Sequence, residues 1–128
     1  MKWFGSCFHR PHALLVKPNK PFLSINNVKA PGYLYMIKER EFIKTHENIF
    51  KIGKTTNIKH RMPAYPKDSR VYVIMYCATD IHVVEKKIIE HFDAQFTKRT
   101  DIGHEYYFAE SESDIIFCFL DIMTKLTC

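Results

Sequence analysis

The sequence has no run of apolar residues that approaches the about 18 needed for a membrane-spanning helix. It also has no CxxC pair, and its four scattered cysteines show neither the spacing of a zinc site nor a disulfide-dense pattern. Residues 1–18 have only short apolar runs broken by His, Arg and Pro, unlike a secretory signal. No internal repeat or low-complexity segment is present. We therefore expect an intracellular protein with reduced thiols that is neither secreted nor bound to a membrane.

The chain of 128 residues is long enough for one domain with a hydrophobic core and too short for two. Residues 1–30 carry three prolines and no lasting hydrophobic periodicity, which predicts an irregular N-terminal arm that is basic and rich in aromatic residues. These aromatic residues favour an arm that packs on the domain. The folded domain itself is expected over residues 31–128.

The charge is divided unevenly along the chain. Residues 1–70 hold 14 Lys and Arg residues against 4 Asp and Glu residues, whereas residues 71–128 hold 5 against 10. A basic half beside an acidic half indicates a polyanion bound on one side of the molecule, although lysines that only solvate the surface are the alternative. The charge pattern therefore favours a nucleic-acid partner.

Hydrophobic periodicity predicts a mixture of strands and helices. The strand expected at residues 70–79 is the most apolar and should be central and buried, and the other strands are expected at 31–38, 48–55 and 104–110. A short helix capped by Asn57 and ended by prolines is expected at 56–62, and longer helices at 81–92 and 111–126. The pattern is that of an α+β domain in which a small antiparallel sheet is flanked by helices.

The helix expected over residues 81–92 contains one carboxylate in an unusual place. At about 100° per residue the apolar side chains gather on one stripe, and Glu85 falls in the middle of that stripe. An unpaired carboxylate buried there would cost several kcal/mol or take up a proton. Glu85 is therefore a candidate site residue.

The first two strands bring a second set of candidates together. Strand alternation places Tyr35 on one face of the first strand, and Lys51 and Gly53 on a single face of the second. If these faces meet, a phenol, an ammonium and a bare patch of backbone line one shallow cleft, where Gly53 lets a phosphate approach the main chain. Lys51 would lower the pKa of Tyr35, which could then take a proton from water. The alternative is that Tyr35 is an ordinary strand residue.

These motifs follow one another in the order found in a known family. "GYLY", "FKIGKTTN", Arg61, Glu85 and "HEYYF" together resemble the GIY-YIG endonuclease superfamily, and most closely its small stand-alone members in phages and large DNA viruses. The likeness covers about residues 32–110. It implies a small sheet flanked by helices that hydrolyses phosphodiester bonds in DNA with one divalent metal ion. A viral member would work in the cytoplasm or nucleus of the host cell.

The resemblance also implies roles for individual residues. Arg61 would steady the scissile phosphate, Glu85 would bind one Mg²⁺ or Mn²⁺ ion, and Tyr65 matches a position that holds His or Tyr in relatives. The alternative for Glu85 is a buried ion pair with Arg61 or Lys54. The predicted catalytic residues are thus Tyr35, Lys51, Arg61, Tyr65 and Glu85. The residues predicted to contact nucleic acid are Gly53, Lys54, Lys59 and His60.

The function predicted from these residues is a metal-dependent endonuclease that cuts DNA by attack of water. Tyr35 would be the general base helped by Lys51, Arg61 would stabilise the pentavalent phosphate, and Glu85 would hold the metal. The alternative is a catalytically inactive module of the same fold that binds nucleic acid, because Lys51 and Pro63 depart from the usual pattern of the family.

Overall fold

Ten helices and strands make up the part of the chain that the computed structural model describes, residues 30–127. In chain order they are β1 (Gly32–Lys38), α4 (Arg40–Lys44), β2 (Ile49–Thr55), α5 (Ile58–Arg61), the 3-10 helix η2 (Met62–Ala64), β3 (Arg70–Cys77), α6 (Ile81–Gln95), β4 (Thr97–Lys98), β5 (Tyr106–Phe108) and α7 (Glu112–Thr127). The expected arm lies outside the described residues except for Ala30. None of the helices within this part of the chain combines the length and the apolar character that crossing a bilayer requires.

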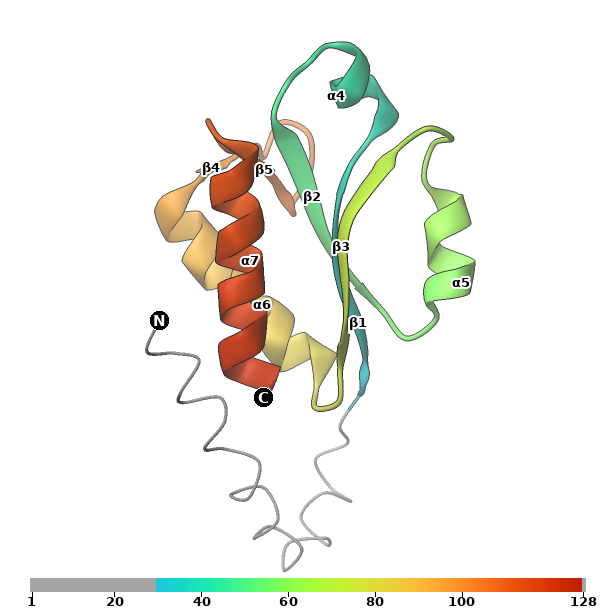
Figure 1. The fold of residues 1–128 in the computed structure, drawn as a ribbon, viewed down its shortest axis with the longest axis vertical. Coiled ribbons are helices and arrows are strands. Elements are labelled where there is room, and N and C mark those ends of the chain that lie inside the picture. The colour runs from blue at the N-terminus through green and yellow to red at the C-terminus, as the bar shows by residue number, and fades with distance from the viewer. Residues whose placement is uncertain (1–29, 128) are drawn as a thin grey trace, which may run out of the picture.

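The five strands form one antiparallel sheet in the order β3-β1-β2-β5-β4. Helices α6 and α7 pack against one face of this sheet, and the short helix α5 lies on the other side (Figure 1). This arrangement confirms the predicted α+β fold, a small antiparallel sheet flanked by helices. It also leaves the face toward α5 only lightly covered, and that is where polar side chains can meet a ligand.

Strand β3 lies at an edge of the sheet, so the prediction that residues 70–79 form the central strand is wrong. Among the described strands β3 pairs with β1 alone, whereas β1 lies between β3 and β2 and is buried along almost its whole length. On β3 the side chains of Val71, Ile74 and Tyr76 are exposed. Composition did not distinguish a central strand from an edge strand, because β-branched and aromatic residues are frequent both in buried strands and in half-exposed ones.

One hydrophobic core lies between the sheet and helices α6 and α7. Leu34 and Met36 point into it from β1, and the other fully buried side chains include Phe50, Ile52, Ile88, Phe92, Phe119 and Met123. Each side chain of this kind contributes about 1.5–3 kcal/mol when it is withdrawn from water. The alternation along β1 is as predicted, because Tyr33, Tyr35 and Ile37 point to the opposite face.

Helix α6 carries Glu85 into this core. Asp80 caps the helix by accepting a hydrogen bond from the backbone N–H of His82 at 2.9 Å. The backbone N–H of Ile81 donates to the carbonyl of Ala30 at 2.9 Å, so the helix starts beside the beginning of β1. The predicted apolar stripe is buried, and Glu85 in its middle is only 4 % exposed.

The 3-10 helix η2 was not predicted as an element distinct from α5, and two further short elements were not predicted at all. Helix α4 occupies part of the connection between β1 and β2, and β4 adds two residues beyond β5. Both are too short for hydrophobic periodicity to identify them. The predicted cap of α5 is confirmed, because Asn57 Oδ1 accepts a hydrogen bond from the backbone N–H of His60 at 3.1 Å.

Candidate functional site

The ring of Tyr35 lies directly on the backbone of Gly53. The two residues are partners in the β1–β2 register, and a Cβ atom at Gly53 would overlap the phenol ring. The shared face that the sequence predicted for Tyr35 and Gly53 is therefore confirmed. The predicted phosphate contact of Gly53 is not, because the ring covers the backbone that a phosphate would approach.

Replacing Gly53 with alanine should lower the free energy of unfolding by about 1–3 kcal/mol, because the new methyl group overlaps the Tyr35 ring and the strand pair has to shift. Chemical denaturation measures this change. In a Tyr35→Ala background, where the ring is absent, the same substitution should cost much less. An equal loss of stability in both backgrounds would show that the Tyr35 ring is not what requires a glycine at position 53.

Tyr65 closes over Tyr35 from the side of α5. The two hydroxyl oxygens are hydrogen-bonded at 2.6 Å, and the ring centroids are 5.9 Å apart in an edge-on arrangement. Tyr65 reaches this position because Pro63, in η2, ends α5 after one turn and the chain then continues in an extended conformation. Tyr35 is 1 % exposed, whereas Tyr65 is half-buried. Two predicted site residues thus meet, and the hydroxyl of the buried Tyr35 is hydrogen-bonded to that of the more exposed Tyr65.

The pKa of Tyr35 is raised above its ordinary value, although a lowered pKa was predicted. Burial of the phenol is the largest cause, and it outweighs the hydrogen bond with Tyr65 and the positive charge of Arg61, which both lower the pKa. The same hydrogen bond raises the pKa of Tyr65, which burial has already raised. The hydrogen bond between the two hydroxyls thus lowers the pKa of Tyr35 and raises that of Tyr65, so it favours ionisation of Tyr35 within the pair.

Lys51 lies on the predicted face of β2 but is engaged by other groups. Its Nζ donates to Glu105 Oε1 at 3.4 Å and lies 4.9 Å from the centroid of the Tyr106 ring. The carboxylate of Glu105 thus holds the ammonium that was expected to act on Tyr35. This pairing is the physical reason why the predicted effect of Lys51 on the pKa of Tyr35 is wrong.

The stability of the fold should decrease as the pH rises above about 10, the ordinary pKa of tyrosine. Burial is the largest cause of a raised pKa at five phenols, those of Tyr35, Tyr65, Tyr72, Tyr106 and Tyr107. The unfolded chain releases these protons at a lower pH than the folded chain, so the unfolded state is favoured as the pH rises. Denaturation midpoints measured from about pH 8 to about pH 11 test this, and a flat profile would contradict it.

Glu85 meets Lys54 on the face of β2 that α6 covers. Lys54 is the register partner of Leu34, so its side chain points toward the core side of the sheet. Lys54 Nζ donates a hydrogen bond to Glu85 Oε1 and forms an ion pair with this carboxylate. Of the two ion pairs considered for Glu85, the structure therefore shows the one with Lys54. Lys54 is only partly buried and is paired with Glu85, and its predicted contact with nucleic acid stays a prediction.

The ion pair does not fully compensate the burial of Glu85. The pKa of Glu85 is raised, first because the carboxylate is desolvated, and the hydrogen bond from Lys54 only partly opposes this. The negative charge of Glu105 raises it further. An additional positive charge near Glu85 would thus stabilise its ionised carboxylate.

Beyond Lys51 one edge of strand β2 is not paired with another described strand, so groups from both faces of the sheet can act on the same region. Strand β5 pairs with β2 only as far as Lys51, and one further hydrogen bond joins the N–H of Ile52 to the carbonyl of Glu105 at 3.0 Å. Among the described strands none continues along this side of β2 to Thr55. The charges of Glu85 and Glu105 both act on the pKa of Tyr35, although Glu85 comes from the opposite face. We call this region the β2 edge site, made up of Tyr35, Lys51, Arg61, Tyr65, Glu85 and Glu105.

The β2 edge site contains one residue that was not predicted for catalysis, Glu105. Its sequence signal is the position directly before the strand Tyr106–Phe108, whose central residue Tyr107 is buried. The remaining predicted residues, Lys59, His60 and Arg61, are exposed on α5, beside the Tyr65 side of the site. Their contact with nucleic acid stays a prediction.

The carboxylates of this region are compatible with Mg²⁺. Within residues 30–127 no three His, Cys, Asp or Glu side chains form a cluster that could hold a metal ion. A closed zinc site would need about four such ligands, whereas Mg²⁺ keeps several waters and binds through one or two carboxylates and phosphate oxygens. Glu85, whose burial is incompletely compensated, is the residue that would hold such an ion, with Glu105 as the nearby second carboxylate.

The structure is thus a small α+β domain with an aromatic and charged site at an open sheet edge, beside exposed cations on α5. The chain belongs to the T5orf172 domain family, which matches residues 32–123. This match supports a function related to nucleic acid. A search of curated proteins and a search of solved structures each found no match.

The family match corrects the resemblance to the GIY-YIG superfamily, since the T5orf172 domain is a different family. The motifs that carried the resemblance are short, and their order alone did not distinguish between the two families. The roles that the resemblance implied for Arg61, Tyr65 and Glu85 therefore depend on the geometry of the β2 edge site.

Proposed function

We propose that the chain is a metal-dependent nuclease that hydrolyses phosphodiester bonds in DNA at the β2 edge site. The observation that carries the proposal is the hydrogen-bonded pair of Tyr35 and Tyr65, positioned beside Arg61 and within the electrostatic influence of the buried Glu85. Proton acceptor, phosphate-binding cation and carboxylate are the groups that hydrolysis by water requires. The family match supports the nucleic-acid part of this function.

In this mechanism the two tyrosines act as a unit. Tyr65 is the more exposed of the two, so its hydroxyl oxygen accepts the proton of the attacking water while its own proton passes to the Tyr35 phenolate. Arg61 lowers the pKa of both tyrosines and so favours the ionised state that starts the transfer. Because the pKa of Tyr35 remains raised, the cleavage rate should still increase as the pH approaches about 10.

Arg61 is suited to bind the phosphate that is attacked. Its guanidinium is exposed at the end of α5 and can donate two parallel hydrogen bonds to phosphate oxygens. Glu85 and Glu105 would hold Mg²⁺, which, when bound, supplies Lewis-acid stabilisation of the charge on the phosphate. Lys54 would remain as the cation that neutralises Glu85 when no metal is bound.

The proposal is tested by incubating the chain with supercoiled plasmid DNA in Mg²⁺ and, in parallel, with the metal chelated. Nicked or linear plasmid should form only with Mg²⁺. Arg61→Ala should lose this activity, while Lys125→Ala, on the outer helix α7, should retain it. Plasmid that stays supercoiled at every Mg²⁺ concentration would contradict the proposal.

A second candidate function is a binding module without turnover. Two observations favour it: Tyr35 is almost completely covered, and Glu85 is already neutralised by Lys54. Such a module would bind DNA with an affinity that falls with salt, and Lys59→Ala should reduce the log–log slope by up to about one unit. Salt-dependent binding together with intact plasmid would favour this second function.

A further inference from the structure

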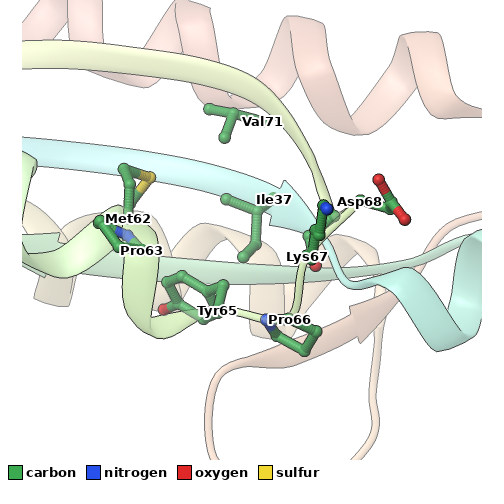
Figure 2. Close-up of a pocket in the computed structure, with 9 residues that line it drawn as sticks. Ile37, Met62, Pro63, Tyr65, Pro66, Lys67, Asp68 and Val71 are labelled. Atoms are coloured by element: carbon green, nitrogen blue, oxygen red, sulfur yellow. The ribbon is translucent and has the colours of Figure 1, made fainter.

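A pocket of about 370 Å³ opens beside the β2 edge site and shares Tyr65 with it. It lies between the lightly covered face of β1 and β3 and the segment that follows α5. Figure 2 shows Tyr65 and Ile37 facing the same space, with Met62 and Pro63 toward one end and Pro66 and Lys67 toward the other. Its size lies within the range of about 300–1,000 Å³ that is typical of small-ligand pockets.

The lining is apolar inside and polar at the rim. Ile37 is fully buried at the bottom, and Val71 on β3 forms part of the wall. Because the Tyr65 hydroxyl is held by Tyr35, its ring is fixed as a flat aromatic wall. An aromatic ring next to prolines and aliphatic side chains is a surface on which a planar group can stack.

The far rim is shaped by a tight turn over residues 66–69. The backbone N–H of Ser69 donates to the carbonyl of Pro66 at 3.1 Å, and Asp68 has a positive φ of 73°. Ser69 Oγ accepts a hydrogen bond from the backbone N–H of Arg40 at 3.0 Å, which ties the turn to the start of α4. Ser69 and Asp68 both belong to the lining at this end of the pocket, and a hydroxyl and a carboxylate are the kinds of group that read the edge of a base.

The surroundings of the pocket are positively charged. Residues 57–70 contain the cations Lys59, Arg61, Lys67 and Arg70 and only one acidic residue, Asp68. Phosphates on both sides of a bound base would therefore meet cations, with Arg61 close enough to Tyr35 and Tyr65 to act on their pKa values and Lys67 in the lining of the pocket.

We propose that this pocket binds one unpaired nucleobase of the strand that lies across the β2 edge site, stacked on Tyr65. The inference rests on the proposed function in one respect, that nucleic acid occupies the neighbouring site. It adds a substrate class: strands with an unpaired or flipped-out base next to the phosphate that is attacked. A fully stacked duplex offers no base to this pocket unless one is extruded.

The test uses a labelled single-stranded oligodeoxynucleotide and a series in which one nucleotide at a time is replaced by an abasic tetrahydrofuran residue. Binding is measured with the metal chelated, so that no cleavage interferes. For wild type, one abasic position should weaken binding about tenfold, the effect expected for one lost stacking contact. Val71→Phe should fill the pocket and reduce this discrimination to less than about twofold.

The matched control is Val83→Phe, which makes the same change at an exposed residue of α6 outside the pocket and should keep the discrimination. Equal affinity of wild type for every oligonucleotide of the series, or unchanged discrimination in Val71→Phe, would overturn the inference. Cleavage is measured in parallel with Mg²⁺. Base discrimination without cleavage supports the pocket and contradicts the nuclease proposal, whereas cleavage without discrimination contradicts the pocket alone.

Discussion

Replacing Tyr35 with phenylalanine should slow DNA cleavage by about 10²–10⁴-fold, the range expected when a proton acceptor is removed. The ring that lies on Gly53 is retained, so the packing of β1 against β2 is preserved. Only the hydroxyl that hydrogen-bonds to Tyr65 is lost. Single-turnover rates measure the effect on chemistry, and thermal unfolding confirms that the fold persists.

Tyr33→Phe is the matched control, because Tyr33 lies on the same face of β1 and its ring packs against Tyr76 instead. Its rate should stay close to that of wild type. Since Tyr35 and Tyr65 act as a unit, Tyr65→Phe should be similarly slow, and the double variant should be little slower than either single one. Activity of Tyr35→Phe within a few-fold of wild type would show that Tyr35 is only a packing residue.

Replacing Glu85 with glutamine should abolish Mg²⁺-dependent cleavage and remove any increase in melting temperature that Mg²⁺ gives to wild type. The reason for the second effect is that an ion bound to the folded state alone stabilises it by mass action. The free energy of unfolding without metal should change little. Burial already disfavours the charged carboxylate, and the side chain of Lys54 is 31 % exposed, so its ammonium can turn to water when its partner becomes neutral.

Glu90→Gln is the control for this substitution, since Glu90 is exposed on the same helix. It should keep both cleavage and the response to Mg²⁺. A purely structural ion pair gives the opposite result for Glu85→Gln. Its stability would fall by about 3–5 kcal/mol with or without metal, because the partner charge would be left uncompensated in the protein. That outcome would show that Glu85 has a structural role and is not a metal ligand.

The parts of the site that depend on local periodicity could be predicted from the sequence. Alternation along two strands placed Tyr35 and Gly53 on one shared face, as the β1–β2 register confirms. The period of an α-helix showed Glu85 in the middle of an apolar stripe, and α6 does bury it. Both predictions need only neighbouring residues and the geometry of one element.

The parts that depend on contacts between distant residues could not be predicted. Tyr65 is 30 residues from Tyr35 in the chain, and Lys51 is 54 residues from the Glu105 that holds its ammonium. The edge position of β3 follows from where the later strand β5 joins the sheet, which β3's own composition does not show. Burial of the Tyr35 phenol, which depends on the assembled fold, also reversed the expected direction of its pKa shift.

The central claim is that the β2 edge site hydrolyses DNA rather than only binding it. The most direct measurement is a single-turnover time course on an end-labelled DNA strand, with the chain in excess, with Mg²⁺ and with chelator, after a binding assay has shown that the strand is saturated. We expect shorter labelled products only with Mg²⁺, formed by wild type and Glu90→Gln but not by Glu85→Gln. A strand that is fully bound and remains intact with Mg²⁺ would contradict the claim.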